Sequence, residues 1–181
     1  MNNSIQVLPD SAHTVSGPIE QVFLNHYDLV YRTAYRVTGN ATDAEDVLQT
    51  LFVRLLKRAP SKVESGWPAY LRRAAINTSL DVVRRRARGV SLGDMEPWIE
   101  STDPNPERTH ESIEVGDRLR TALADMHANS AEMFVLRHVE GYTNREIAKM
   151  LGTSSGSVAV TLFRARGLLR KSLKSFRGGR S

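Results

Sequence analysis

A segment near the carboxyl end, TNREIAKMLGTSSGSVAVTLFRAR at residues 143–166, has residue types and spacing suited to binding nucleic acid. Its spacing turns Ile147, Ala148 and Leu151 inward, allows a tight turn at Gly152, and packs the next helix back through Val158 and Leu162. This pattern predicts a helix-turn-helix whose second helix can enter a major groove. A plain helical hairpin is the alternative, but the exposed positions are basic and hydroxylated rather than mixed in charge. The basic ones are Arg145, Lys149, Arg164 and Arg166.

A second basic constellation is WPAYLRRAAINTSLDVVRRRAR at residues 67–88. An apolar stripe of Leu71, Ala75, Leu80 and Val83 leaves the arginines on the other faces. Arginine binds phosphate and asparagine pairs with base edges, so this helix is predicted to follow a phosphate backbone, with Asn77 available to bases. Arginines at a helix end also complement the helix dipole, and this alternative applies to Arg86 and Arg88. The remaining candidates are Arg72, Arg73, Arg84 and Arg85.

Metal and thiol chemistry have little support in the composition. The chain has no cysteine, which excludes a disulfide framework, a cysteine zinc site and a thiol nucleophile. Its five histidines show neither HxxxH nor HExxH spacing, and no carboxylate cluster joins them. We therefore expect no metal, no cofactor and no catalytic residue.

Charge divides the chain into three parts. Residues 1–88 carry 12 basic and 8 acidic side chains, residues 89–117 carry 1 and 8, and residues 118–181 carry 12 and 4. Two basic blocks flanking an acidic strip favour phosphate backbones as ligands, through counterion release. A basic protein with solvated faces explains the charge alone equally well. The amino terminus lacks a signal-peptide pattern and no run of about 18 apolar residues occurs, so we expect a cytoplasmic protein without membrane insertion.

Helical periodicity covers most of the first half of the chain. Apolar residues recur every three or four positions over residues 18–38, at Phe23, Tyr27, Val30, Ala34 and Val37. A second helix is predicted to run to about Arg58, with Thr42 as its N-cap and Glu45 completing a capping box. Its buried face is predicted to be Ala44, Val47, Leu48, Leu51, Phe52 and Leu55. A third helix begins at Trp67 and ends near Arg88.

The second half begins with a segment without periodicity. Between Gly89 and about Pro106 the charges are acidic and prolines appear, which is typical of an interdomain linker. Four more helices are predicted over residues 113–126, 131–140, 143–151 and 155–173, with Asn129 or Ser130 as the N-cap of the second of these. The chain is predicted to be all-α, with two small helical domains. The expected divisions are a disordered tail (1–17), a three-helix domain (18–88), an acidic linker (89–114), a four-helix domain (115–174) and a basic tail (175–181).

The arginine-rich helix at residues 67–88, followed along the chain by the helix-turn-helix at residues 143–166, resembles the arrangement in the extracytoplasmic-function (ECF) subfamily of sigma-70 family RNA polymerase sigma factors. The family's D-A-E-D-x-x-Q helix is matched by Asp43, Ala44, Glu45, Asp46 and Gln49. Its tryptophan-led, arginine-rich helix is matched by Trp67, Asn77 and Asp81. Its helix-turn-helix motif is matched by residues 140–166, and the resemblance as a whole covers roughly residues 20–88 and 115–173.

The resemblance implies a sigma region 2 domain followed by a sigma region 4 domain, in a promoter-reading subunit that is not itself an enzyme. Region 2 would bind the β and β′ subunits of core RNA polymerase through Asp43, Glu45, Asp46 and Gln49. The arginine-rich helix and the loop before it would capture the −10 element of melted promoter DNA, with one base extruded into a pocket. The residues implied are Arg58, Lys62, Trp67, Arg72, Arg73, Asn77, Arg84, Arg85 and Arg88. Many relatives are held inactive by an anti-sigma protein, which would be a further partner.

The helix from Ser155 would read the −35 element in double-stranded DNA. The residues implied are Arg145, Ser154, Ser155, Ser157, Thr161, Arg164 and Arg166. Relatives usually carry basic or polar residues at the three positions after Val158, but here these positions hold Ala159, Val160 and Thr161. Either the target is richer in thymine methyl groups, or the serines and Arg164 carry the binding with less specific readout.

The acidic linker has two interpretations. Its carboxylates are Asp94, Glu96, Glu100, Asp103, Glu107 and Glu111. In the family the corresponding stretch threads polymerase toward the active site, where its acidity would mimic nucleic acid. A solvated flexible tether is the alternative.

Two functions from other classes compete with this interpretation. A conventional helix-turn-helix regulator that binds an operator as a dimer explains residues 143–166, but it leaves residues 43–49 and the first basic block unassigned. An enzyme acting on nucleic acid would need a cluster of metal-binding carboxylates, and the acidic residues 43–46 lie at a predicted helix start, where dipole and docking roles suffice.

Overall fold

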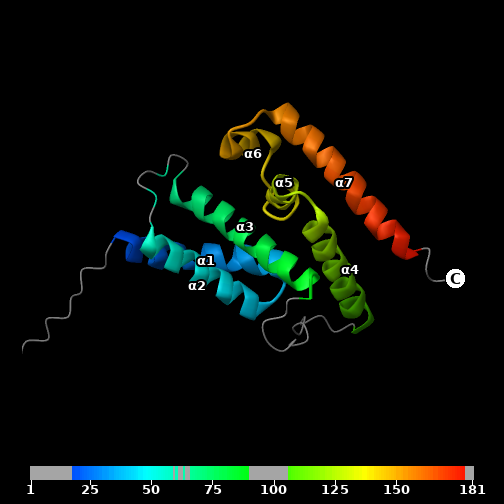
Figure 1. Ribbon diagram of the computed structural model, residues 1–181, viewed down its shortest axis with the longest axis horizontal. Coiled ribbons are helices and arrows are strands. Elements are labelled where there is room, and N and C mark those ends of the chain that lie inside the picture. Colours follow the sequence, from blue (N-terminus) through cyan, green and yellow to red (C-terminus); the bar gives the residue numbers. More distant parts are fainter. Residues whose placement is uncertain (1–17, 59, 61–62, 64–65, 90–105, 178–181) are drawn as a thin grey trace, which may run out of the picture.

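The structure of the chain is a computed structural model, which describes residues 18–58, 60, 63, 66–89 and 106–177. These residues form seven α-helices and no strand (Figure 1). The helices are α1 (Pro18–Thr38), α2 (Ala41–Lys57), α3 (Trp67–Ala87), α4 (Pro106–Asp125), α5 (Ala128–His138), α6 (Asn144–Leu151) and α7 (Ser155–Arg177). The predicted all-α class and the order of three helices followed by four are confirmed.

The first three helices pack together around an apolar core. Helix α1 contacts both α2 and α3, and the core between them contains Val30, Leu51, Leu55 and Leu71. The predicted buried faces of α2 and α3 are confirmed, although Leu48 is only half-buried.

The buried stripe of α1 differs from the prediction in its first two turns. Phe23 and Tyr27 are exposed, and Val22 faces the core in their place. Phe23 instead lies edge-on against Phe52, with ring centroids 4.6 Å apart, and so covers the core from its rim. The three predicted positions further along, Val30, Ala34 and Val37, are buried.

The capping box predicted at Thr42 and Glu45 is wrong. Asn40 is the N-cap of α2: its backbone is extended, and its side-chain oxygen accepts a hydrogen bond from the Asp43 amide at 2.9 Å. The helix starts earlier than predicted because Gly39, with φ of 66°, reverses the chain directly before Asn40.

Three further boundaries differ from the prediction. Helix α4 begins at Pro106, seven residues before the predicted start, because proline suits the first helical turn. Helix α5 has His127 as its N-cap, without a side-chain hydrogen bond, so neither Asn129 nor Ser130 caps it. Helix α7 continues to Arg177, into the stretch predicted as a basic tail.

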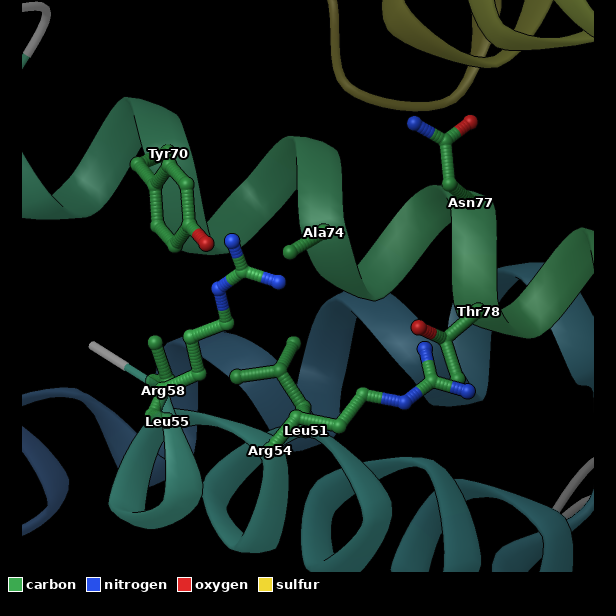
Figure 2. Close-up of a pocket in the computed structure, with 8 residues that line it drawn as sticks. All are labelled: Leu51, Arg54, Leu55, Arg58, Tyr70, Ala74, Asn77 and Thr78. Carbon is green, nitrogen blue, oxygen red and sulfur yellow. The ribbon is translucent and has the colours of Figure 1, made fainter. Parts of the chain in front are cut away.

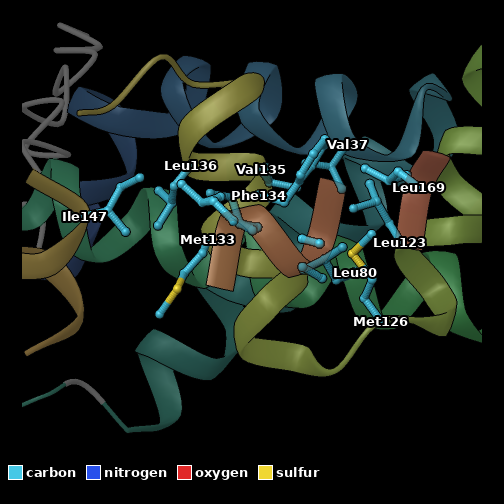
Figure 3. Close-up of a cluster of buried hydrophobic side chains, with 14 of the residues drawn as sticks. Val37, Leu80, Leu123, Met126, Met133, Phe134, Val135, Leu136, Ile147 and Leu169 are labelled. Carbon is cyan, nitrogen blue, oxygen red and sulfur yellow. The ribbon is translucent and has the colours of Figure 1, made fainter. Parts of the chain in front are cut away.

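The two groups of helices share one apolar core. Helix α3 packs against α4 and α5 as well as against α1 and α2. The shared cluster combines Val37 and Leu80 from the first group with Leu123, Phe134 and Val135 from the second (Figure 3). The α3 residues Ile76 and Val83 belong to it too. The chain is therefore folded in a closed arrangement, with α3 at the boundary.

Candidate nucleic-acid interface

Helix α6 starts at a complete capping box. The Thr143 amide donates to Glu146 Oε2 at 2.8 Å, and the Glu146 amide donates to Thr143 Oγ1 at 3.3 Å. The hydrogen bonds from the Thr143 hydroxyl and amide lower the pKa of the Glu146 carboxyl. Two otherwise unpaired backbone donors are thereby satisfied at the start of an eight-residue helix.

A left-handed glycine and a serine cap join α6 to α7. Gly152 ends α6 with φ of 63° and ψ of 38°, and its amide donates to the Ala148 carbonyl. Ser154 Oγ then accepts from the Ser157 amide at 3.1 Å, which stabilises the start of α7. Ile147, Ala148, Val158 and Leu162 are buried between these helices, and the predicted helix-turn-helix is confirmed.

Most of the predicted −35 residues lie on the outer surface of this unit. Arg145, Ser154, Ser155, Ser157, Arg164 and Arg166 are exposed. Thr161 is half-buried, and Arg166 Nε donates to the Leu162 carbonyl at 3.3 Å. The start of α7 is thus hydroxylated, and exposed basic side chains follow from Arg164 onward; both kinds of group can bind phosphate.

Sequence reasoning missed Phe163. Its side chain is 74 % exposed, and the nearby Val160 is 51 % exposed, so two large apolar groups face outward on α7. The signal was present in the sequence, because both positions lie off the buried stripe formed by Val158, Leu162 and Ala165. An apolar residue on the exposed side of a recognition helix is suited to contact thymine methyl groups.

Two of the predicted −10 residues on α3 are bound by carboxylates of the second group of helices. Arg73 Nε donates to Glu132 Oε1 at 2.8 Å, and Arg72 pairs with Glu140. The guanidinium of Arg72 also lies 5.5 Å from the ring centroid of Tyr142. This side of α3, which the sequence predicts to face DNA, therefore faces α5 and the turn after it in this structure.

The arginines near the end of α3 have partners closer by. Arg84 pairs with Asp81 at 3.1 Å, and Arg88 Nε donates to the Arg84 carbonyl at 3.2 Å, in keeping with the dipole role considered for Arg88. Arg86 pairs with Asp43 of α2 at 2.8 Å. Arg85 is exposed.

A pocket of about 200 Å³ lies between α2 and α3. In Figure 2 the guanidinium of Arg58 approaches Tyr70, and that of Arg54 approaches Thr78. Figure 2 also shows the amide of Asn77 directed away from α2. The polar lining of the pocket consists of two guanidiniums and two hydroxyls, which can donate hydrogen bonds to a base or a phosphate. Arg54, Tyr70 and Thr78 were not predicted as site residues. Helical periodicity indicates which side of each helix faces the core, but it does not indicate which side chains of two helices line a shared pocket.

Trp67 lies at the edge of the first core. Its side chain is half-buried against the α1–α2–α3 cluster, and its ring is edge-on to Tyr70 with centroids 5.8 Å apart. The predicted residue Lys62 lies outside the described residues, as do Asp94, Glu96, Glu100 and Asp103 of the acidic linker. The backbone of Glu107 and Glu111 belongs to α4.

The predicted docking residues on α2 fall into two environments. Glu45, Asp46 and Gln49 are exposed on one side of the helix. Asp43 is buried beside Arg86, and burial raises the pKa of its carboxyl more than Arg86 lowers it. A docking surface on α2 is therefore left to the three exposed residues.

The described part of the chain holds neither a cluster of metal ligands nor a helix that could span a membrane. Among residues 18–58, 66–89 and 106–177, no three His, Cys, Asp or Glu side chains lie close enough together to hold a metal ion. No helix within those ranges is long and apolar enough to cross a membrane.

Comparison with known proteins places the two groups of helices in named regions. Residues 22–89 match the family model of Sigma-70 region 2, and residues 116–169 match that of Sigma-70, region 4. The RNA polymerase sigma-E factor of Streptomyces avermitilis is 30 % identical over 165 residues, a match that covers 91 % of this chain and 89 % of that protein. This chain is an ECF sigma factor of the sigma-70 family.

A second sequence relative and a solved structure are consistent with this family and fold. The ECF RNA polymerase sigma factor SigE of Mycolicibacterium smegmatis is 33 % identical to this sigma factor over 153 residues, which cover 83 % of this chain and 60 % of that protein. The solved structure of CnrH in complex with the cytosolic domain of CnrY is 22 % identical, with a TM-score of 0.51 over 87 % of this chain and 88 % of that one. The likeness to CnrH supports the fold.

Proposed function

We propose that this sigma factor binds core RNA polymerase through α2, and that α3 and α7 then direct the enzyme to the −10 and −35 elements of promoters. The observation that carries the proposal is the presence, in one chain, of an exposed acidic side on α2 and two arginine-bearing helices in separate domains. An operator-binding dimer would use α7 but has no use for the α2 surface. The chemistry of RNA synthesis would belong to the polymerase, in the cytoplasm.

Docking would use Glu45, Asp46 and Gln49. Their side chains lie on one exposed side of α2 and can pair with basic groups on polymerase. Charge reversal at Asp46 should therefore reduce copurification with core polymerase. Asp125→Lys is the matched control, because Asp125 is also exposed but lies at the end of α4.

The −10 element would be captured by the arginines of α3 and by the pocket between α2 and α3. Extruding one base from a duplex costs on the order of a few kcal/mol, which hydrogen bonds in the pocket and phosphate contacts must offset. Arg58, Tyr70 and Thr78 line the pocket, and Trp67 lies beside it through its contact with Tyr70. If Trp67→Ala leaves open-complex formation unchanged, Trp67 is a core residue only.

The −35 element would be read by the exposed side of α7. Val160 and Phe163 favour a target rich in thymine methyl groups, and the serines at the start of α7 with Arg164 would contact phosphates. A binding selection with the whole chain should return an A·T-rich −35 consensus. Phe163→Ala should weaken that preference, and a G-rich consensus would argue against it.

The acidic linker would enter the polymerase cleft along the path of the RNA. Its carboxylates would mimic nucleic acid there. Replacing residues 90–105 with Gly and Ser at the same length tests this role, because unchanged initial RNA synthesis and promoter escape would leave a tether as its only role.

The decisive experiment is transcription in vitro with purified core polymerase on a genomic library. Initiation at discrete sites that depends on this chain, with shared −10 and −35 sequences, would support the proposal and supply the consensus. Binding to DNA without any initiation by added core polymerase would instead favour the operator-binding regulator.

A further inference from the structure

The polar side chains that line the pocket between α2 and α3 are mainly hydrogen-bond donors. They are the guanidiniums of Arg54 and Arg58, the hydroxyls of Tyr70 and Thr78, and the amide of Asn77. Figure 2 shows that this amide is directed away from α2, which leaves two guanidiniums and two hydroxyls at the cavity. A guanidinium has several N–H donors and no acceptor. The pocket therefore suits a ligand that is rich in acceptor oxygens.

The two arginines of the pocket have no counter-charge among the described residues. Neither Arg54 nor Arg58 forms an ion pair with a described carboxylate. Six other arginines of region 2 do form ion pairs, namely Arg32, Arg36, Arg72, Arg73, Arg84 and Arg86. Arg54 and Arg58 lie one helical turn apart on α2, and like charges at this spacing destabilise a helix. A bound anion would remove that repulsion.

The dipole of α2 explains part of this arrangement. Arg54 is in the last turn of the helix and Arg58 is its C-cap, so both cations lie at the negative end of the dipole. Lys57 lies in the same turn but does not line the pocket. A dipole role would require neither the cavity nor the hydroxyls of α3, and Lys57 is therefore a matched control.

A phosphate group fits these donors better than a nucleobase does. Every base has at least one N–H donor on its pairing edge, and the hydroxyls of Tyr70 and Thr78 are the only side-chain acceptors that face the cavity. A donor that is taken out of water without a partner costs free energy. Phosphate oxygens are acceptors only, and a guanidinium can bind them through two parallel hydrogen bonds. Leu51, Leu55 and Ala74 line the rest of the pocket and can contact an attached sugar.

We propose that Arg54 and Arg58, with Tyr70 and Thr78, form a phosphate-binding site on region 2. Both arginines are exposed in this structure, so a phosphate can reach them without any movement of the helices. The phosphate can belong to the DNA backbone beside the −10 element, or it can be free inorganic phosphate. The DNA source rests on the proposed function, whereas the site itself does not.

The two sources are linked by competition. A backbone phosphate in the pocket would position the DNA strand without reading its sequence, because phosphate contacts carry no direct information about the base. The choice of sequence would then be left to the other residues of α3. Free phosphate would compete for the same donors, so capture of the −10 element should weaken as the phosphate concentration rises.

Binding of inorganic phosphate to the full-length chain tests the site itself. Guanidinium and amide signals in NMR spectra are followed while sodium phosphate replaces sodium chloride at constant ionic strength. Arg54→Gln should weaken binding about tenfold, and Tyr70→Phe, which changes no charge, should weaken it about threefold. Lys57→Gln removes the same charge from the same helical turn and should change binding less than about twofold.

Three single-stranded oligonucleotides of equal length distinguish the sources of the phosphate. The first has a mixed sequence, the second has abasic sugars on a normal backbone, and the third has the mixed sequence on uncharged methylphosphonate linkages. If the pocket holds a DNA phosphate, Arg54→Gln should weaken binding of the first two strands by the same factor, about tenfold, and leave the third unchanged. Inorganic phosphate should also displace the first two strands.

The outcomes separate the site from the proposed function. Equal losses of phosphate binding in Arg54→Gln and Lys57→Gln would overturn the site, because the arginines would then only complement the helix dipole. A loss for both strands that carry bases, with none for the abasic strand, would overturn it in favour of a base pocket and leave promoter reading intact. Phosphate binding that depends on Arg54, with no effect on any strand, would support the site and assign it to the free anion.

Two further measurements complete the test. Circular dichroism shows whether each variant is folded, and Arg58→Gln repeats the test at a second exposed position. Transcription with core polymerase tests the proposed function separately. A chain that binds phosphate through Arg54 but never supports initiation would overturn that function and leave the site in place. A chain that supports initiation but binds no phosphate, free or in DNA, through Arg54 or Arg58 would overturn the site alone.

Discussion

Asp43, in the first turn of α2, pairs with Arg86, in the last turn of α3, at 2.8 Å, and its carboxylate is almost entirely buried. The pair links the start of one helix to the end of another within region 2. Only one carboxylate oxygen is used, since Asp43 Oδ2 has no hydrogen-bond partner among the described residues. A buried and partly satisfied carboxylate makes stability depend on pH.

Asp43→Asn should remove that dependence. Burial raises the pKa of Asp43 above that of the unfolded chain, so its contribution to stability is fully present below pH 3.8 and is lost as the pH rises through the folded-state pKa. At pH 7 the variant should be within about 1 kcal/mol of wild type or more stable, because Arg86 is half-exposed and stays solvated. Urea unfolding over a pH series measures this. A profile parallel to that of wild type would contradict it.

The ionisation of Glu146 should change the stability of the chain with pH in the opposite direction to that of Asp43. The hydrogen bonds from Thr143 lower the pKa of Glu146, so its contribution is present above pH 4.5 and is lost as the pH falls through the folded-state value. Wild type should be more stable than Glu146→Gln at pH 7, and the two should converge in acid, as followed by thermal unfolding. In a Thr143→Ala background the pH-dependent effect of the same substitution should be smaller, because the hydroxyl is lost while the amide of residue 143 still donates to Glu146 Oε2. An effect as large as in the wild-type background would mean that another group is responsible.

Two glycines in region 4 should respond to alanine with opposite signs. Gly152 has φ of 63°, so alanine there should cost about 1–2 kcal/mol from backbone strain alone, since an added Cβ meets nothing within 4 Å. Gly167 lies inside α7 and its added Cβ also meets nothing, so alanine there should stabilise by about 0.5–1 kcal/mol. Chemical unfolding of both variants gives the two values. Equal effects would show that the turn does not need a left-handed residue.

Leu80→Ala should weaken both domains together. Leu80 is fully buried in the cluster shared by region 2 and region 4, so truncation should cost about 2–5 kcal/mol. Leu168→Ala, at an exposed position on α7, is the control and should cost less than about 0.5 kcal/mol. Tryptophan fluorescence and backbone circular dichroism should shift to the same lower urea midpoint. Separate midpoints would show that the domains unfold independently.

The helix-turn-helix and the buried faces of α2 and α3 were predictable because each is written in the periodicity of a short segment. The ion pairs of Arg72 and Arg73 were not. Their partners Glu140 and Glu132 lie 68 and 59 residues away in the sequence, and helical spacing carries no information about such distant contacts. An exposed arginine and one that pairs with another domain have the same local pattern.

Caps were also poorly predicted. Thr42 and Asn40 are both good N-cap residues, and the choice between them depended on the turn at Gly39. Phe163 was missed for a different reason. An apolar residue away from the buried stripe can be recognised from the sequence, but only polar residues were predicted on the DNA side of α7.

The cluster that joins α3 to α5 also limits how such a protein can be recombined. A chimera that takes region 2 from one relative and region 4 from another would bring Ile76 and Leu80 against a surface shaped for different side chains. Such a chimera would be less soluble, because its apolar contact between α3 and α5 would be poorly packed. Transferring the α5 residues Glu132, Phe134 and Val135 together with α3 would avoid this. To transfer promoter specificity from this chain to another, a segment larger than either DNA-binding domain would therefore have to be moved.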